Sequence, residues 1–218
     1  MKITSIICCL LSLFATSCAN SQQCIDGINK LPMFGNVKKC KEQIDDDKTF
    51  IETCEKSPGR KAYAAHMVVR GWQYLHRGDL DTSTMRFNQA WLLDSLNAEI
   101  YWGFGDILGM QKKYTESIPY FEKALRLAPD SARIWQDASV SYGNAFFETK
   151  NQTYLNSTIK ALKRSINIGP GSAALYSQLT AAYCYFYQKD SARKYLKITD
   201  KLYPGTINPE VRAMLSSK

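Results

Sequence analysis

The sequence repeats with a period of 34 residues from about Ala64 to its C-terminal end. Residues of the same kind recur one period apart, as Gly71 and Gly105 do, and as Phe87 and Phe121 do. A unit of this length has room for two short helices, which cannot bury their apolar faces alone, whereas stacked copies bury a shared core. The period therefore predicts an all-α solenoid of helix-turn-helix units.

The clearest unit covers residues 98–131. Apolar residues recur there at helical spacing on both sides of a short turn at 112–113. Pro129 ends the second helix, because proline cannot continue a helix. Gly105 and Ala124 are small residues at the places where the two helices approach closely. With its aromatic, small and proline residues in this order, the segment resembles the tetratricopeptide repeat (TPR), which implies a right-handed TPR α-solenoid.

Four such units are predicted, at 64–97, 98–131, 132–172 and 173–206. The third carries seven more residues than the period, around 146–155. This excess predicts either that both of its helices are longer by about one turn or that a loop protrudes. Residues 207–218 are expected to form a C-terminal capping helix, with Asn208 as its N-cap and Pro209 in its first position.

Residues 36–63 are expected to form an N-terminal capping region that packs on the first repeat. Apolar and cysteine residues recur there at spacings of three, four and seven, namely Val37, Cys40, Ile44, Ile51 and Cys54. This spacing indicates one amphipathic helix, or two helices broken near 45–47.

Residues 1–17 have the pattern of a signal peptide. The segment has a positive start, an apolar core too short to span a bilayer permanently, and the small residues Ala15 and Ser17 before Cys18. A cysteine in this place resembles a bacterial lipoprotein cleavage box. That resemblance implies lipidation of Cys18, residues 18–35 as a lipid-anchored tether, and contact with a membrane through the anchor. Ordinary signal cleavage is the alternative.

A second, narrower resemblance supports export. The run 86–93, followed by 101–105, is similar to a group of secreted bacterial repeat proteins, which implies a location at the cell envelope or in the periplasm. Disulfides persist in such oxidising surroundings.

The cysteines that remain after export allow one disulfide. The sequence leaves open whether Cys24 pairs with Cys40, with Cys54 or with neither, and the cysteines that do not pair, Cys184 among them, are expected to be buried thiols. If Cys40 and Cys54 share one helix, about 21 Å separates them and they cannot pair.

Lysine and arginine outnumber acidic residues, so the formal net charge is +8. Between residues 150 and 201, nine Lys and Arg stand against two Asp. This excess indicates either a solvated outer helix face or a surface for anionic head groups or acidic partners. A nucleic-acid partner is not expected, because no binding motif accompanies the charges. The sequence predicts no catalytic constellation, cofactor or metal site, since its cysteines match no zinc pattern.

The TPR resemblance implies a groove lined by the inner face of the first helix of each unit. Carried onto this sequence, the lining consists of Val68, Trp72, His76, Glu99, Trp102, Asp106, Met110, Gln136, Asn144, Ser177, Cys184 and Tyr185. The predicted face is aromatic with scattered polar groups, which suits an extended or helical peptide anchored by apolar side chains.

These observations predict a non-enzymatic scaffold at the bacterial cell envelope that binds a protein or peptide through an aromatic concave groove. The alternative is a structural tether or accessory subunit of an envelope complex. Such a protein would bind through its convex or basic C-terminal face.

Overall fold

The computed structural model describes residues 23–56 and 59–216 of the protein. In this part of the chain there are ten α-helices, three short 3-10 helices and no strand, which confirms the all-α prediction. The α-helices are α1 (Lys41–Lys56), α2 (Arg60–His76), α3 (Leu80–Leu93), α4 (Ala98–Met110), α5 (Tyr114–Leu127), α6 (Ala132–Thr149), α7 (Gln152–Ile168), α8 (Ala173–Tyr185), α9 (Lys189–Leu202) and α10 (Pro209–Ser216). None of these helices is both long and apolar enough to cross a membrane. The expected signal peptide and Cys18 lie outside the described residues.

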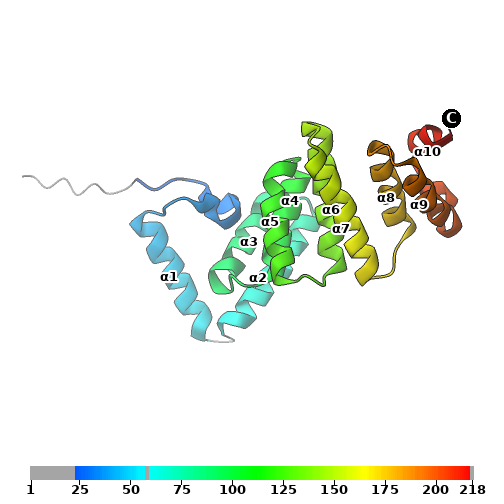
Figure 1. Cartoon of the computed structure of the whole chain (residues 1–218). Helices are drawn as coiled ribbons and strands as arrows, with labels where there is room; N and C mark the ends of the chain where they lie inside the picture. Colours follow the sequence, from blue (N-terminus) through cyan, green and yellow to red (C-terminus); the bar gives the residue numbers. More distant parts are fainter. Residues whose placement is uncertain (1–22, 57–58, 217–218) are drawn as a thin grey trace, which may run out of the picture.

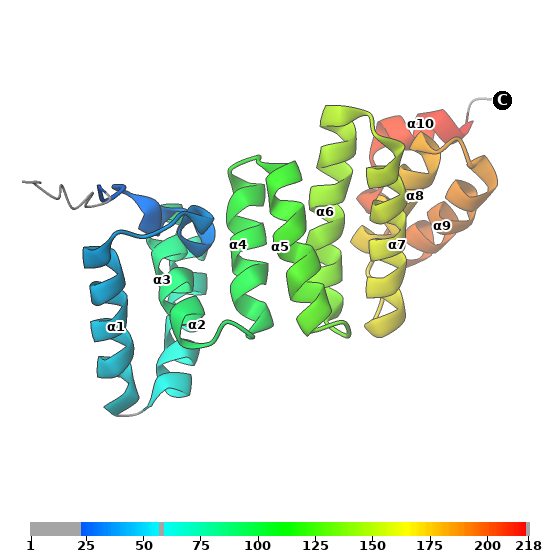
Figure 2. The ribbon, with the colours of Figure 1, turned by 60° about the vertical axis from the view of Figure 1, so that its left-hand side comes forward.

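The helices follow one another in an elongated row, with α1 and α10 at opposite ends (Figure 1). Four successive pairs pack most extensively: α2 with α3, α4 with α5, α6 with α7, and α8 with α9. Figure 2 shows α4, α5 and α6 standing side by side in the middle of this row. Each pair is joined by a short turn, as a solenoid of helix-turn-helix units requires. The first pair begins at Arg60, four residues before the predicted unit.

The recurring glycines and phenylalanines of the 34-residue period are packing partners. A Cβ atom added to Gly105 on α4 would lie 2.9 Å from Cε2 of Phe121 on α5, and one added to Gly71 on α2 would lie 2.8 Å from Cζ of Phe87 on α3. Both phenylalanine rings are buried. Because interiors are close-packed, a glycine at each of these places lets the ring of the second helix reach the backbone of the first.

The extra residues of the third unit lengthen both of its helices. Helix α6 has 18 residues and α7 has 17, against 13 and 14 for α4 and α5. The turn between α6 and α7 is short, and it contains Lys150 in the left-handed conformation, with φ of 58°. Of the two alternatives for this unit, longer helices are correct and a protruding loop is wrong.

The N-terminal cap is a single helix, α1, so a break near 45–47 does not occur. Cys54 is buried with Ala64 and Leu93 in a small cluster that joins α1 to α2 and α3. Val37 is not part of this helix, because α1 begins after Cys40. Cys40 is bonded instead to Cys24. The pairing of Cys24, which the sequence leaves open, is therefore with Cys40, and Cys54 and Cys184 are buried thiols.

Part of the predicted tether is folded. From Cys24 onward the chain forms two 3-10 helices, η1 (Ile28–Lys30) and η2 (Pro32–Asn36), which pack on α3. Ile28 and Phe34 are buried there. The prediction of a tether over 18–35 is wrong for this stretch, because a disulfide and buried apolar side chains hold it against the first repeat.

The C-terminal end closes the row as expected. Oδ1 of Asn208 accepts a 2.8 Å hydrogen bond from the backbone N–H of Glu210, so Asn208 caps the start of α10. Val211 and Leu215 bury their side chains in a cluster with α8 and α9.

Candidate functional site

The first helices of the second and third units enclose a pocket with two carboxyl groups. This pocket, called here the acidic pocket, has a volume of about 350 Å³. Asp106 on α4 and Asp137 on α6 line it. Further lining residues are Leu75, Gly109, Met110, Tyr114, Phe121, Val140, Ser141 and Asn144.

A second pocket lies between α6, α7 and α8. This apolar pocket has a volume of about 190 Å³, and its walls include Phe147, Leu155 and Tyr185. The rings of Phe147 and Tyr185 meet edge to face, with 4.9 Å between their centroids. Val140 and Asn144 line both pockets. The two pockets therefore adjoin across α6, and together they form the structure's candidate groove.

Two tryptophans form an aromatic cluster beside the acidic pocket. The rings of Trp72 on α2 and Trp102 on α4 lie 4.7 Å apart. Nε1 of Trp72 donates a hydrogen bond of 3.2 Å to Oε2 of Glu99, and Nε1 of Trp102 donates one of 2.9 Å to Oδ2 of Asp137. Nδ1 of His76 lies 2.7 Å from the carbonyl oxygen of Trp72. The cluster links the first, second and third units along their first helices.

The carboxyl groups of the acidic pocket hold their protons more tightly than exposed ones. Burial and, to a smaller extent, the charge of Asp137 raise the pKa of Asp106 to about 8, although the positive charge of Arg133 acts in the opposite direction. Burial also raises the pKa of Asp137, against the opposing effects of the Trp102 hydrogen bond and Arg133. The guanidinium carbon of Arg133 lies 4.9 Å from the centroid of the Trp102 ring. At neutral pH Asp106 is therefore protonated. The guanidinium group of Arg133 lies over one face of the Trp102 indole ring.

The structure brings together most of the residues expected in the groove. Trp72, His76, Glu99 and Trp102 belong to the aromatic cluster, Asp106, Met110 and Asn144 line the acidic pocket, and Tyr185 lines the apolar pocket.

Four of the expected residues lie elsewhere. Val68 and Cys184 are buried in the core, so their side chains are not available to a ligand. Oγ of Ser177 donates to the carbonyl oxygen of Thr206, which ties it to the C-terminal end. Gln136 lines neither pocket. The repeat positions fail here because a fixed offset does not distinguish a first-helix residue that faces the groove from one that packs against the next unit.

Sequence reasoning missed Asp137 and Phe147. Asp137 lies four residues after Arg133, so the two side chains share one face of α6. Two opposite charges four residues apart on one helix were the available signal. Phe147 lies in the last turn of α6, in the residues by which the third unit exceeds the period.

The described residues contain one group that could in principle hold a metal ion, formed by Cys24, Cys40 and Glu42. The two cysteines are joined to each other in a disulfide. Since a thiolate is the form that binds metals, this group is not a metal site while the disulfide is intact.

Comparison with known proteins agrees with the helical repeat. No family profile matches the chain. Among curated proteins, the human mitochondrial import receptor subunit TOM70 is 25% identical over 149 residues, which is 67% of this chain and 24% of that protein. A tetratricopeptide repeat-containing protein of Caenorhabditis elegans, trd-1, is 25% identical over 175 residues, or 78% of this chain and 20% of that protein. The chain thus spans about a quarter or less of the length of these relatives.

Solved structures share the architecture. MamA superposes with a TM-score of 0.57 and 19% identity, covering 74% of this chain and 91% of that one. A thermophilic TPR protein of Thermus thermophilus gives 0.53 and 18%, covering 70% and 79%. The pilF protein of Pseudomonas aeruginosa gives 0.57 and 16%, covering 72% and 67%. The chain therefore has the fold of a TPR-like helical repeat.

Proposed function

We propose that the protein is a non-enzymatic scaffold that binds an extended segment of a partner protein along the groove. The observation that carries this proposal is the pair of adjoining pockets on either side of α6, one with two carboxyl groups and the other aromatic. Neighbouring helices are about 8–10 Å apart, and an extended chain rises about 3.3 Å per residue. A segment crossing α6 would reach both pockets with side chains about three residues apart.

The chemistry of the pockets favours a partner with one basic and one apolar anchor. A lysine or arginine in the acidic pocket would pair with Asp137 and would ionise Asp106, because a nearby positive charge lowers the pKa of a carboxyl group. Arg133 supports this assignment, since a guanidinium already lies against the ring of Trp102. The apolar pocket would take an aromatic or aliphatic side chain between Phe147 and Tyr185.

We further propose that the protein is exported and lipid-anchored at Cys18. The sequence pattern over 1–17 supports export, and so does the disulfide between Cys24 and Cys40, because disulfides persist in oxidising compartments. A tether attached at Cys18 would leave the groove, which begins at α2, free to meet a partner.

A second candidate function uses the basic C-terminal face. Helix α9 carries Lys194, Lys197 and Lys201 as exposed residues, and none of them lines the groove pockets. A structural tether or accessory subunit would bind an acidic partner through this face.

Crosslinking followed by affinity purification from cells that express the protein separates the two candidates. The groove variant combines Asp106→Asn with Phe147→Ala, and the control variant is Tyr203→Ala, which removes an exposed ring outside the groove. Circular dichroism first verifies that both variants fold. We expect a partner that the wild type and Tyr203→Ala capture and that the groove variant loses. A partner retained by the groove variant and lost after Lys194→Glu and Lys197→Glu would support the second candidate instead.

A further inference from the structure

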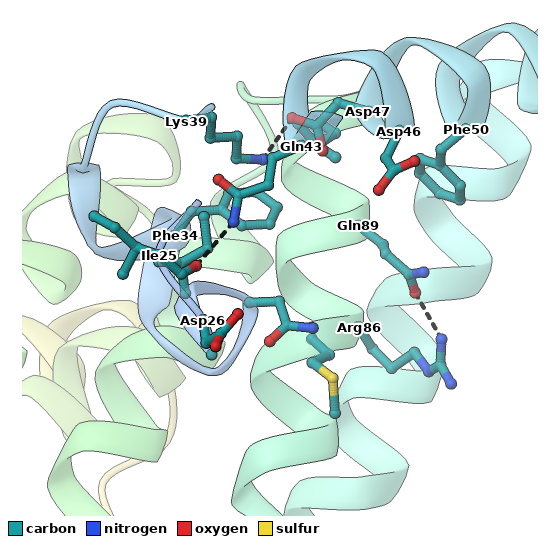
Figure 3. A pocket seen from close by; sticks show the side chains of 15 residues that line it. Ile25, Asp26, Phe34, Lys39, Gln43, Asp46, Asp47, Phe50, Arg86 and Gln89 are labelled. Atoms are coloured by element: carbon teal, nitrogen blue, oxygen red, sulfur yellow. Dashed lines mark hydrogen bonds and ion pairs between the residues drawn. The ribbon is translucent and has the colours of Figure 1, made fainter. Parts of the chain in front are cut away.

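A separate pocket lies at the N-terminal end of the row, between the disulfide-closed segment 24–40, helix α1 and helix α3 (Figure 3). Its volume is about 410 Å³, which is within the range of small-molecule sites. It shares no lining residue with either groove pocket. We call it the N-terminal pocket, and the inference below does not depend on the proposed function of the groove.

The segment that forms one wall of this pocket is held in a strained conformation. Met33, Phe34 and Asn36 have φ values of 51°, 56° and 54°, in the left-handed region that residues other than glycine rarely adopt. Such strain persists only where the surrounding structure imposes it, and it is concentrated at binding sites.

Two devices impose this conformation. The disulfide between Cys24 and Cys40 closes the segment at its ends. In its middle, Nδ2 of Asn88 on α3 donates 2.9 Å hydrogen bonds to the carbonyl oxygens of Asn29 and Leu31. The wall is therefore fixed to the first repeat independently of any ligand.

The charged side chains of the pocket divide into a neutralised pair and unpaired groups. Nζ of Lys39 pairs with Asp47 and lies 3.1 Å from the centroid of the Phe34 ring. Asp46 on α1 has no ion-pair partner among the residues that the structure describes. Arg86 on α3 donates a 2.7 Å hydrogen bond to Gln89 but meets no carboxylate in the described chain. Opposite charges thus face the same cavity from two different helices.

Asp26, in the segment 24–40, is a third lining charge without an ion pair among the described residues. The surroundings of Asp46 and Arg86 differ. Asp46 lies beside the ring of Phe50 on α1, whereas Arg86 lies beside Gln89 on α3 (Figure 3). A carboxylate next to an aromatic ring suits an ammonium group. A guanidinium suits a carboxylate, which it can bind with two parallel hydrogen bonds. Apolar side chains line the space around them, among them Ile25, Met85 and Leu92.

We propose that the N-terminal pocket binds a zwitterionic small molecule, a free amino acid or a dipeptide, with its ammonium group at Asp46 and Phe50 and its carboxylate at Arg86. The apolar walls would receive the ligand's side chain. The pocket requires the closed segment, so the ligand binds the form with an intact Cys24–Cys40 disulfide.

Isothermal titration calorimetry with the twenty free amino acids and a set of dipeptides tests the ligand class. We expect at least one of these compounds to bind the wild type, and its N-acetylated and C-amidated forms to bind at least tenfold more weakly. If no compound of the panel binds the folded wild type, or if the blocked forms bind as well as the free one, the proposal is wrong.

Two matched pairs of variants test the residues. Asp46→Asn and Arg86→Gln should each weaken binding at least tenfold. Asp45→Asn removes the neighbouring carboxylate, which does not line the pocket, and should leave affinity unchanged. Arg77→Gln is the control for Arg86. The guanidinium carbons of both arginines lie 6.0 Å from the centroid of the Tyr74 ring, but Arg77 does not line the pocket. Equal losses in a variant and its control would contradict the assignment.

A third measurement tests the role of the disulfide. Cys24→Ser combined with Cys40→Ser should reduce affinity at least tenfold while circular dichroism shows the helices intact. The groove substitution Asp106→Asn should leave affinity unchanged, which separates failure of this site from failure of the groove. Full affinity in the double serine variant would overturn the dependence on the closed segment.

Discussion

Nε1 of Trp102 on α4 donates a 2.9 Å hydrogen bond to Oδ2 of Asp137 on α6, and this bond joins the second and third units beside the acidic pocket. Trp102 is buried, so its N–H has little access to water. A buried donor without a partner costs about 1–3 kcal/mol. The bond therefore contributes to the geometry of the groove as well as to stability.

Replacement of Asp137 tests this bond. Asp137→Ala leaves the indole N–H of Trp102 without its acceptor, and we expect it to lower the free energy of unfolding by about 1–3 kcal/mol. Asp137→Asn retains a carbonyl oxygen and should cost less. Urea denaturation followed by tryptophan fluorescence measures both variants. Equal stabilities for the alanine and asparagine variants would show that the hydrogen bond does not matter.

The raised pKa of Asp106 makes stability depend on pH. The folded state keeps its proton up to a pKa of about 8, whereas the ordinary value is 3.8. The stabilisation from this group is thus complete below pH 3.8 and is lost as pH rises toward 8. One pKa unit corresponds to about 1.4 kcal/mol, and we expect the wild type to lose at least that much between pH 5 and pH 8.

Asp106→Asn should reduce this loss, because the amide does not titrate, and should make the protein more stable than the wild type at pH 8. Urea denaturation at several pH values measures the effect. Asp190→Asn is the control, since its carboxylate is fully exposed and its removal should leave the slope unchanged. A slope that persists in Asp106→Asn would assign the pH dependence to other groups.

The glycines of α4 differ in the space around them. A Cβ atom on Gly105 would lie 2.9 Å from Cε2 of Phe121, whereas one on Gly109 would meet nothing closer than Oγ of Ser141 at 3.6 Å. Overpacking of a core costs about 1–3 kcal/mol, and alanine is favoured over glycine in a helix by about 0.8–1 kcal/mol. We expect Gly105→Ala to lower the melting temperature and Gly109→Ala to leave it unchanged or raise it. Similar effects of the two substitutions would contradict the packing role of Gly105.

The proposed lipid anchor predicts where the protein is found after cell fractionation. The wild type should sediment with membranes and require detergent for extraction, because a lipidated Cys18 holds it at the surface. Cys18→Ala should appear in the soluble fraction. A wild type that is soluble without detergent, or a variant that remains bound to membranes, would contradict lipidation at this residue.

The repeat made the helical pairs predictable, because the two helices of each unit pack through residues of the same kind at the same positions. Gly105 and Phe121 are 16 residues apart in the sequence, as are Gly71 and Phe87, and each pair packs across its hairpin. The extra residues around 146–155 were recognisable as an insertion, but their placement in longer helices depends on packing of α7 against α8. The period carries no information about that contact.

The candidate site was less predictable, because the packing of neighbouring units decides which side chains of each first helix point into the groove. Trp102 and Asp106 lie in the groove region as expected. Val68, by contrast, is buried, and the α6 residue that lines the acidic pocket is Asp137 and not the expected Gln136. The folded segment 24–40 escaped prediction for a different reason. Its order comes from a disulfide and from hydrogen bonds of Asn88, which lies far away in the sequence.

Site-specific photocrosslinking in living cells tests the groove as the partner-binding surface most directly. A photoreactive phenylalanine analogue replaces Met110, an exposed residue of the acidic pocket, or Tyr203, an exposed residue outside the groove. The groove proposal predicts a partner adduct from position 110, its loss in the Asp106→Asn, Phe147→Ala background, and no adduct from position 203. An adduct from position 203 without one from position 110 would contradict it.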